Sequence, residues 1–419
     1  MEHFIRYGTT ILNFTIDPGI EVDIITPSVV PPAPDQLAEV QRAIDSPLDF
    51  DWGILNRIRN VGIAINDKTR PVPHKYLFPP LLKKLEQHGL PKDKIRFFIA
   101  TGTHLPMSPD EFGEVIPADL LSMYQIESHN CDDSSNLQLI GNTPIGTPVW
   151  VNKRYYETDL KIVIGNIEPH HFMGFSGGNK SASIGLTSRL TINRNHSLLL
   201  DDRSRLGAYL DNPMRQDVEQ IGKLIGVHLA VNAILNDKKE IIQALAGSPL
   251  EVMASGYPQA TKSCQIPVDG LYDLVIASAG GYPKDINLYQ AQKALTNASL
   301  ITRPGGTVIL VTECIEGVGS QGYVDFMQGV LSFEEALVKF QQTEFTVGPH
   351  KAYQFAKIGS RIRIVLKSAI PQEQVEQLLL IPASDMQTCI HDELEKLGNN
   401  PRIAILPLAS ITLPTFRSR

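Results

Sequence analysis

The sequence has few cysteines, and none of them forms a recognisable pair. The four are Cys131, Cys264, Cys314 and Cys389, and no C-x-x-C spacing occurs. This pattern argues against a structural zinc knuckle and against a disulfide framework. It is typical of proteins from the reducing cytoplasm, which is the location that we expect.

Long apolar runs and low-complexity tracts are also missing. No segment approaches the roughly 20 apolar residues that a membrane-spanning helix needs. The N-terminus, MEHFIRYGTTILNFTI, alternates polar and apolar residues like a strand hairpin and lacks the apolar core of a signal peptide. We therefore expect an ordered globular chain without a membrane partner.

The chain has no excess of positive charge. Its formal net charge is -7, whereas a general nucleic-acid surface needs a basic stripe that neutralises phosphates. The sequence thus argues against a nucleic-acid partner and favours a small-molecule ligand.

Four short apolar runs, each followed by a polar loop, form the most regular pattern in the chain. They lie at 61–65, 95–100, 160–165 and 274–277. Such runs are typical of strands that are buried on both faces of a parallel sheet. Helical patterns alternate with further strand patterns after residue 288, so the predicted fold class is α/β.

The chain is long enough for two domains. Its 419 residues exceed the size at which one hydrophobic core usually stops growing. Helical patterning ends and a new buried strand begins near residues 263–269. We therefore expect two α/β domains, an N-terminal one at 1–266 and a C-terminal one at 267–419.

Polar residues gather in the four loops that follow the predicted strands. In open α/β sheets, ligands bind outside the carboxyl ends of the strands, so these loops are the expected walls of a site. The richest stretch, EPHHFMGFSGGNK at 168–180, includes Gly174, Gly177 and Gly178. Glycine allows positive φ and close approach of the backbone to a bound group.

One interpretation of this stretch is a phosphate-binding P-loop. The end of the glycine-rich turn, Lys180-Ser181, is similar to the last two residues of G-x-x-x-x-G-K-S. However, Asn179 replaces the glycine before the lysine, and a histidine pair separates the turn from the preceding strand. A nucleotide-binding protein therefore remains an alternative.

Another interpretation is a zinc-dependent hydrolase. Its ligands would be His170, His171 and His196, with a carboxylate completing the set. Adjacent histidines rarely both bind one metal, and the chain has no H-E-x-x-H motif. Any single histidine here could also simply form a hydrogen bond within a loop.

Five motifs taken together resemble those of the nickel-pincer lactate racemases and their hydroxy-acid racemase and epimerase relatives. The resemblance spans at least residues 60–300. The motifs are D-x-T-R-P at 67–71, T-G-T-H at 101–104, P-H-x-x-x-G-F-S-G-G-x-K at 169–180, N-x-x-H at 193–196 and G-G-Y-P-K-D-x-x-x-Y-Q-x-x-K at 280–293.

The resemblance implies a cofactor, the nickel-pincer nucleotide pyridinium-3-thioamide-5-thiocarboxylic acid mononucleotide. Lys180 matches the lysine that carries it through a thioamide. His196 matches the imidazole that completes the nickel ligands, a sensible partner for sulfur donors. The resemblance also implies partner proteins that make and insert the cofactor. Further cofactor contacts would come from Asp67, Thr69, Gly177 and Gly178.

The resemblance also implies a reaction, the racemisation or epimerisation of a 2-hydroxy acid. The hydroxyl proton leaves, a hydride moves to the cofactor, and a 2-oxo acid receives the hydride back on its opposite face. His104 and His170 match the two bases, and Asp67 would orient Arg70 or a histidine. The active site would lie in the cleft between the two domains. The substrate carboxylate would be held by Arg70, Tyr289, Gln290 and Lys293.

The sequence departs from the lactate enzymes at Gly348–Tyr353, where those enzymes carry a tryptophan-bearing loop. His350 and Lys351 add polar and cationic groups that would suit a second carboxylate or several hydroxyls. We therefore expect a lactate-like substrate or a larger one such as malate, 2-hydroxyglutarate or a gluconate-type sugar acid. A carrier that binds the nucleotide without turnover is disfavoured, because both His104 and His170 are present.

Overall fold

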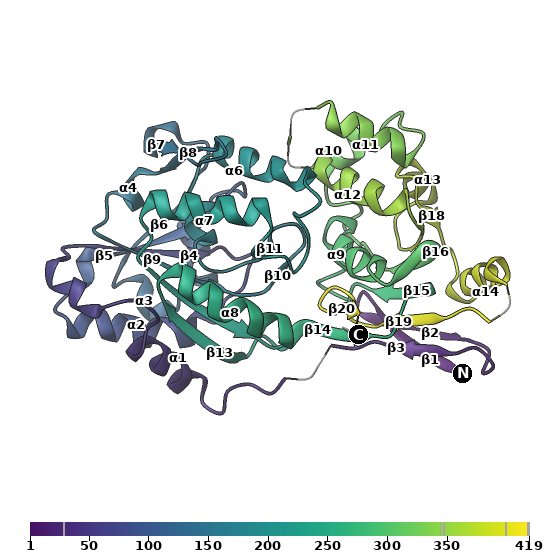
Figure 1. Ribbon diagram of the computed structural model, residues 1–419, viewed down its shortest axis with the longest axis horizontal. Coiled ribbons are helices and arrows are strands. Elements are labelled where there is room, and N and C mark those ends of the chain that lie inside the picture. Colours follow the sequence, from purple (N-terminus) through teal and green to yellow (C-terminus); the bar gives the residue numbers. More distant parts are fainter. Residues whose placement is uncertain (28–29, 344, 347, 399, 417–419) are drawn as a thin grey trace. The chain divides into compact units, whose positions relative to one another are not determined.

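The chain folds into two compact α/β units (Figure 1). The computed structural model describes residues 1–27, 30–343, 345–346, 348–398 and 400–416. One unit is Val29–Ser263, and the other combines Met1–Ser28 with Cys264–Arg419. The predicted fold class is confirmed. The expected division at 266/267 differs from these units at residues 1–28 and 264–266. Near the N-terminus, β3 (Val22–Ile24) pairs with β19 (Ile403–Leu406) of the second unit.

The Val29–Ser263 unit is built on a six-stranded sheet in the order β13-β12-β9-β4-β5-β6. All its strands run parallel except β13, which is antiparallel to β12. The three predicted strands of this unit are confirmed as β4, β5 and β9. The strand bounds are β4 (Val61–Asn66), β5 (Ile95–Ala100), β6 (Gln125–Ser128), β9 (Leu160–Asn166), β12 (Leu229–Leu235) and β13 (Ile241–Gly247).

Helices cover both faces of this sheet (Figure 1). Along β4, Ile63 and Ile65 pack in the core beneath α1 and α2, while Ala64 packs in the core beneath α7 and α8. This alternation explains why an apolar residue stands at every position of the run. The helices are α1 (Gln36–Asp45), α2 (His74–Gln87), α3 (Ala118–Leu121), α4 (Lys153–Tyr156), α5 (Lys180–Ser183), α6 (Arg189–His196), α7 (Pro213–Ile225) and α8 (Pro249–Cys264). Two short antiparallel pairs are added by β7 (Leu137–Asn142) with β8 (Pro148–Asn152) and β10 (Pro169–His170) with β11 (Gly174–Phe175).

The other unit contains a parallel sheet in the order β18-β17-β16-β15-β19-β3. Its remaining strands are β15 (Tyr272–Ser278), β16 (Thr302–Val311), β17 (Arg363–Lys367) and β18 (Ile381–Pro382), with β14 (Gln265–Val268) paired to β20 (Leu413–Phe416). Its helices are α9 (Leu288–Ser299), α10 (Gln321–Met327), α11 (Phe333–Gln341), α12 (Pro349–Gly359), α13 (Gln372–Gln377) and α14 (Met386–Leu397). In the part of the chain that the structure describes, no helix has the length and apolar character needed to cross a bilayer.

The predicted N-terminal hairpin is confirmed as β1 (Glu2–Tyr7) and β2 (Thr10–Thr15). Its apolar side chains Ile5 and Phe14 are buried in the same core cluster as Ile276 and Ile309 of the second sheet. The buried Asp285 carboxylate accepts the Gly8 amide at 2.6 Å. The hairpin is therefore a structural part of the second unit.

We predict that Phe14→Ala destabilises the protein by about 3–5 kcal/mol, because this ring is 2% exposed and its loss leaves a cavity. Phe4→Ala is the matched control, since Phe4 lies on the same hairpin but is 58% exposed. It should change stability by about 0.5 kcal/mol or less. Urea unfolding measures both, and equal effects would contradict the burial of the hairpin.

Candidate functional site

Three of the predicted loops leave the same edge of the sheet in the Val29–Ser263 unit. Strands β9, β4 and β5 are adjacent and parallel, so the loops at 67–71, 101–104 and 168–180 all begin at their carboxyl ends. This is the edge at which α/β sheets bind ligands. The fourth predicted loop, at 280–283, follows β15 in the other unit.

The loops after β4 and β5 join through a carboxylate–histidine pair. Asp67 Oδ2 lies 2.6 Å from Nδ1 of His104, and Asp67 Oδ1 accepts the Thr69 hydroxyl at 2.7 Å. Burial opposes ionisation of Asp67, but the hydrogen bonds from His104 and Thr69 outweigh it and hold its pKa below the usual range. The carboxylate thus keeps the proton of His104 on Nδ1, so Nε2 is the ring atom that accepts a proton.

In His170, Nδ1 accepts a hydrogen bond, whereas in His104 it donates one. His170 ends β10, and its Nδ1 accepts the backbone N–H of Met173 at 3.3 Å. The neutral ring therefore carries its proton on Nε2. The Phe172 ring packs edge-on against it at 4.6 Å between centroids, and the Phe172 carbonyl accepts a hydrogen bond from Asn212. The two predicted bases thus differ in whether Nε2 accepts or donates.

His196 has the properties of a metal-binding imidazole. It is the last residue of α6, and its Nδ1 donates to the carbonyl of Ile192 at 3.0 Å, which leaves the lone pair on Nε2. Burial and the nearby charges of Lys180 and Arg70 lower the pKa of His196 to about 3. The ring is therefore neutral near pH 7. It lies close enough to Lys180 and Arg70, the two predicted ligand-binding cations, for their charges to affect its pKa.

A buried ion pair holds the glycine-rich loop against α7. The Arg215 side chain is fully buried and donates to the carbonyls of Phe175 and Gly177, each at 3.1 Å. Its Nε also donates to Glu219 at 2.9 Å. The other oxygen of Glu219 accepts the Asn179 amide at 2.7 Å. The residue directly before Lys180 is thus fixed to this helix.

Sequence reasoning missed Arg215 and Glu219. The available signal was their i,i+4 spacing next to the buried stripe Met214, Val218 and Ile221 of α7. A charged pair on the buried side of a helix needs polar partners inside the protein. The same contacts explain Asn179, which the P-loop pattern could not.

The two predicted cofactor glycines lie where the backbone has positive φ and where neighbouring side chains leave no room for a Cβ. Gly177 has φ +89°, and a Cβ there would lie 2.8 Å from the side chain of Ile167. Gly178 has φ +54°, and its Cβ would lie 2.5 Å from Met253. The Gly178 amide donates to Asn232 at 2.7 Å. The backbone conformation of the loop therefore requires glycine at both positions.

The protein donors fit a single-imidazole metal site better than a zinc cluster. Within the described residues, no three His, Cys, Asp or Glu side chains gather as a ligand set. A zinc hydrolase needs such a set. A nickel ion that takes its other donors from a bound nucleotide needs one protein imidazole, and His196 beside Lys180 suits that requirement.

The P-loop alternative also lacks its structural context. In a P-loop the glycine-rich turn joins a strand of the main sheet directly to a helix. Here the antiparallel pair β10–β11 lies between β9 and Lys180, and the helix that follows, α5, has only four residues.

The remaining predicted substrate residues lie together on α9 of the other unit. The Asn287 side chain caps this helix by accepting the Gln290 amide at 3.0 Å. Gln290 and Lys293 are exposed, whereas Tyr289 is half-buried. In the same unit, Lys351 of α12 places Nζ 4.4 Å from the centre of the Tyr289 ring. The segment that departs from the family pattern, which forms the first turn of α12, is thus in contact with the predicted substrate helix.

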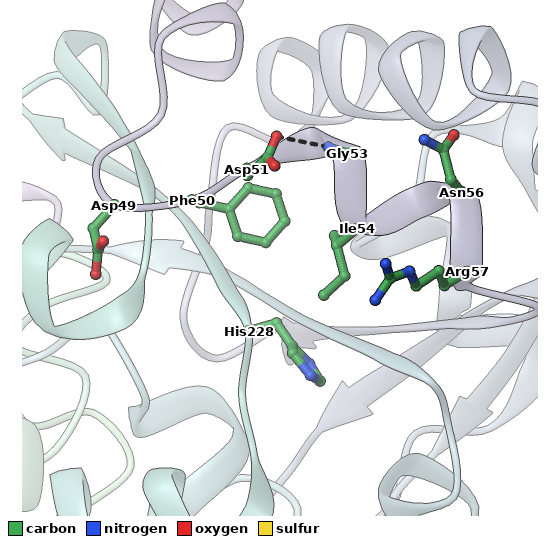
Figure 2. A pocket seen from close by; sticks show the side chains of 8 residues that line it. All are labelled: Asp49, Phe50, Asp51, Gly53, Ile54, Asn56, Arg57 and His228. Atoms are coloured by element: carbon green, nitrogen blue, oxygen red, sulfur yellow. Dashed lines mark hydrogen bonds between the residues drawn. The ribbon is translucent and has the colours of Figure 1, made fainter.

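A hollow of about 670 Å³ in the Val29–Ser263 unit is not this site (Figure 2). It is lined by residues that precede strands, including Arg57 before β4 and His228 before β12. It therefore opens at the amino ends of the strands, and none of the predicted site residues lines it.

Two family models match the chain in succession. The lactate racemase N-terminal domain matches residues 7–207, and the lactate racemase C-terminal domain matches residues 269–411. A lactate racemase from Lactiplantibacillus plantarum is 33% identical over 288 residues, which is 68% of each chain. A lactate racemase from Thermoanaerobacterium thermosaccharolyticum is 27% identical over 376 residues, which is 88% of each chain.

Solved structures show the same architecture. The lactate racemase apoprotein from T. thermosaccharolyticum superposes with a TM-score of 0.91 at 26% identity, covering 99% of this chain and 100% of that one. A Thermotoga maritima protein has the same fold, with a TM-score of 0.64 at 15% identity and coverage of 91% and 97%. The class is therefore that of an isomerase, a racemase built from two α/β domains. The chain belongs to the lactate racemase family.

We predict that Asp67→Asn lowers kcat for racemisation by roughly 100-fold or more with little change in KM. The amide would donate to His104 Nδ1 and shift the ring proton to Nε2, which removes the accepting atom. Ring ¹⁵N chemical shifts of His104 report this tautomer independently of activity. The control is Asp110→Asn at an exposed carboxylate. Full kcat in Asp67→Asn would contradict the role of the pair.

Arg215→Met should destabilise the protein by about 3–5 kcal/mol, because it leaves Glu219 buried without its cation. The double variant Arg215→Met/Glu219→Leu should recover part of this loss, since both charges are then removed. Arg205→Met, which breaks an exposed pair with Asp211, should cost about 1 kcal/mol or less. Urea unfolding compares the three variants; equal losses for Arg215→Met and Arg205→Met would exclude a structural role for the buried pair.

Proposed function

We propose that the chain racemises or epimerises a 2-hydroxy acid with the help of a nickel-pincer nucleotide joined to Lys180. The observation that carries the proposal is the hydrogen bonding of two histidines, which leaves Nε2 as an acceptor in one and as a donor in the other. His104 presents an accepting Nε2 because Asp67 holds its other nitrogen, whereas His170 presents a donating Nε2. Two such groups suit a reaction that removes a proton on one side of a substrate and returns one on the other.

In the proposed cycle, His104 or His170 takes the proton of the 2-hydroxyl group while C2 loses its hydride. The product is a planar 2-oxo acid, which is achiral at C2. The second histidine, in its protonated imidazolium form, returns a proton to the oxygen when the hydride returns to the opposite face, and both histidines recover their starting protonation by exchange with water. Arg70, with Tyr289, Gln290 and Lys293, would hold the carboxylate so that only C2 changes configuration.

Lys180 and His196 would hold the cofactor, Lys180 by a covalent thioamide and His196 by its Nε2 on nickel. When bound, the nickel-pincer nucleotide supplies a reversible hydride acceptor. The neutral His196 ring and its nearness to Lys180 support these roles. Asp67, Thr69, Gly177 and Gly178 would line the same cofactor site.

We infer that the two units supply different parts of the active site. The Val29–Ser263 unit would carry the cofactor and both bases, and the second unit would complete the substrate site through α9. The relatives are named for lactate, so the substrate would be lactate or a larger 2-hydroxy acid such as malate, 2-hydroxyglutarate or a sugar acid of the gluconate type. The proteins that make and insert the nucleotide would be its partners, in the cytoplasm.

The test is intact mass and nickel content of the chain co-produced with a nickel-pincer biosynthesis system. Wild type should carry a mass adduct and nickel, and Lys180→Ala should lose both. Lys83→Ala, at an exposed lysine of α2, should keep both. Racemised product from 2-deuterated substrate should retain most of its label. Wild type without adduct or nickel, or rapid loss of the label to water, would overturn the proposal.

A further inference from the structure

Lys351 is a buried cation in the second unit. It lies in the first turn of α12 and is only 4% exposed. Its Nζ donates to Gln292 Oε1 at 3.0 Å and lies 4.4 Å from the centre of the Tyr289 ring. The Gln292 amide nitrogen donates in turn to Thr296 at 2.6 Å, which orients its oxygen toward the lysine. All of these partners belong to α9.

The described part of the chain places no negative charge beside Lys351 that would balance it. Among the residues that the structure describes, no carboxylate lies within ion-pair distance of its Nζ. The charge that acts on it is the like charge of Lys293, one turn along α9 from Tyr289. Burial, and to a lesser degree Lys293, lower the pKa of Lys351 to about 7. An anion bound near Lys351 would be stabilised by the charge of this lysine.

A neighbouring histidine adds a donor to this region. His350 is 5% exposed, and its Nδ1 accepts the backbone N–H of Gly348 at 3.1 Å. The neutral ring therefore carries its proton on Nε2. Its ring lies edge-on to Tyr289, with 6.0 Å between the ring centroids. The positive end of the α12 dipole lies at the same two residues.

We propose that Lys351 recognises the second acidic group of a 2-hydroxy dicarboxylic acid and thereby sets the substrate class. The inference rests on the proposed function, in which Lys293 contacts the carboxylate beside C2. A monocarboxylate would leave Lys351 without a counterion, and the hydroxyls of a sugar acid need no cation. Two neighbouring lysines suit two carboxylates, as in malate or 2-hydroxyglutarate.

The first test compares kcat/KM of cofactor-loaded wild type and Lys351→Met for malate, 2-hydroxyglutarate and lactate. Wild type should prefer a dicarboxylate. Lys351→Met, similar in length but uncharged, should lose roughly 10- to 100-fold on dicarboxylates and roughly 3-fold or less on lactate. Lys396→Met is the control, since it removes the same charge from a lysine of the same unit whose side chain is 54% exposed. It should keep the wild-type preference.

A binding measurement separates this inference from the proposed function. Titration calorimetry of the full chain without cofactor should detect malate binding that Lys351→Met weakens and Lys396→Met does not. If no acid is racemised but this pattern appears, the recognition site stands and the proposed function fails. If racemisation occurs but Lys351→Met keeps the wild-type ratio of malate to lactate, the inference is overturned. A wild-type preference for lactate overturns it whatever the variant does.

Discussion

The buried pair of Arg215 and Glu219 is the interaction on which the geometry of the site depends. A charged pair inside a protein is stable only when its remaining hydrogen bonds are also made. Here those bonds go to the carbonyls of the glycine-rich loop and to Asn179. The requirement to satisfy the ion pair thus fixes the loop that presents Lys180. Gly177 and Gly178 have positive φ in this loop, and a Cβ at either position would lie within 3 Å of Ile167 or Met253.

The parallel order of the sheet explains why residues far apart in sequence act together. Asp67 and His104 come from different loops, yet they meet because β4 and β5 are neighbours in exact parallel register from Val61 and Ile95 onward. A single proton position on His104 then follows from the carboxylate at Nδ1. The chemistry of this histidine is therefore set by sheet topology as much as by residue type.

The strands and loops could be predicted from sequence because a strand buried on both faces leaves a local signal, an unbroken apolar run that ends in polar residues. The placement of β3 could not, since its partner β19 lies about 380 residues away and no local pattern encodes that pairing. The roles of Arg215 and Glu219 were hidden for a similar reason. Arg215 donates to backbone carbonyls of a distant loop, which any residue type supplies, and Glu219 accepts the side-chain amide of Asn179 in the same loop.

The role of Lys351 is inferred from its contacts in the structure, because the family motifs do not include this residue. The family pattern predicted the residues of α9 but offered no partner for a lysine at the start of α12. The structure supplies neutral contacts to it, Gln292 and the face of Tyr289, without a carboxylate in the described chain. Neutral contacts hold a lysine in place while leaving its charge uncompensated. A residue held in this way is suited to discriminate between substrates by their charge, and it can do so without altering the atoms that exchange the proton.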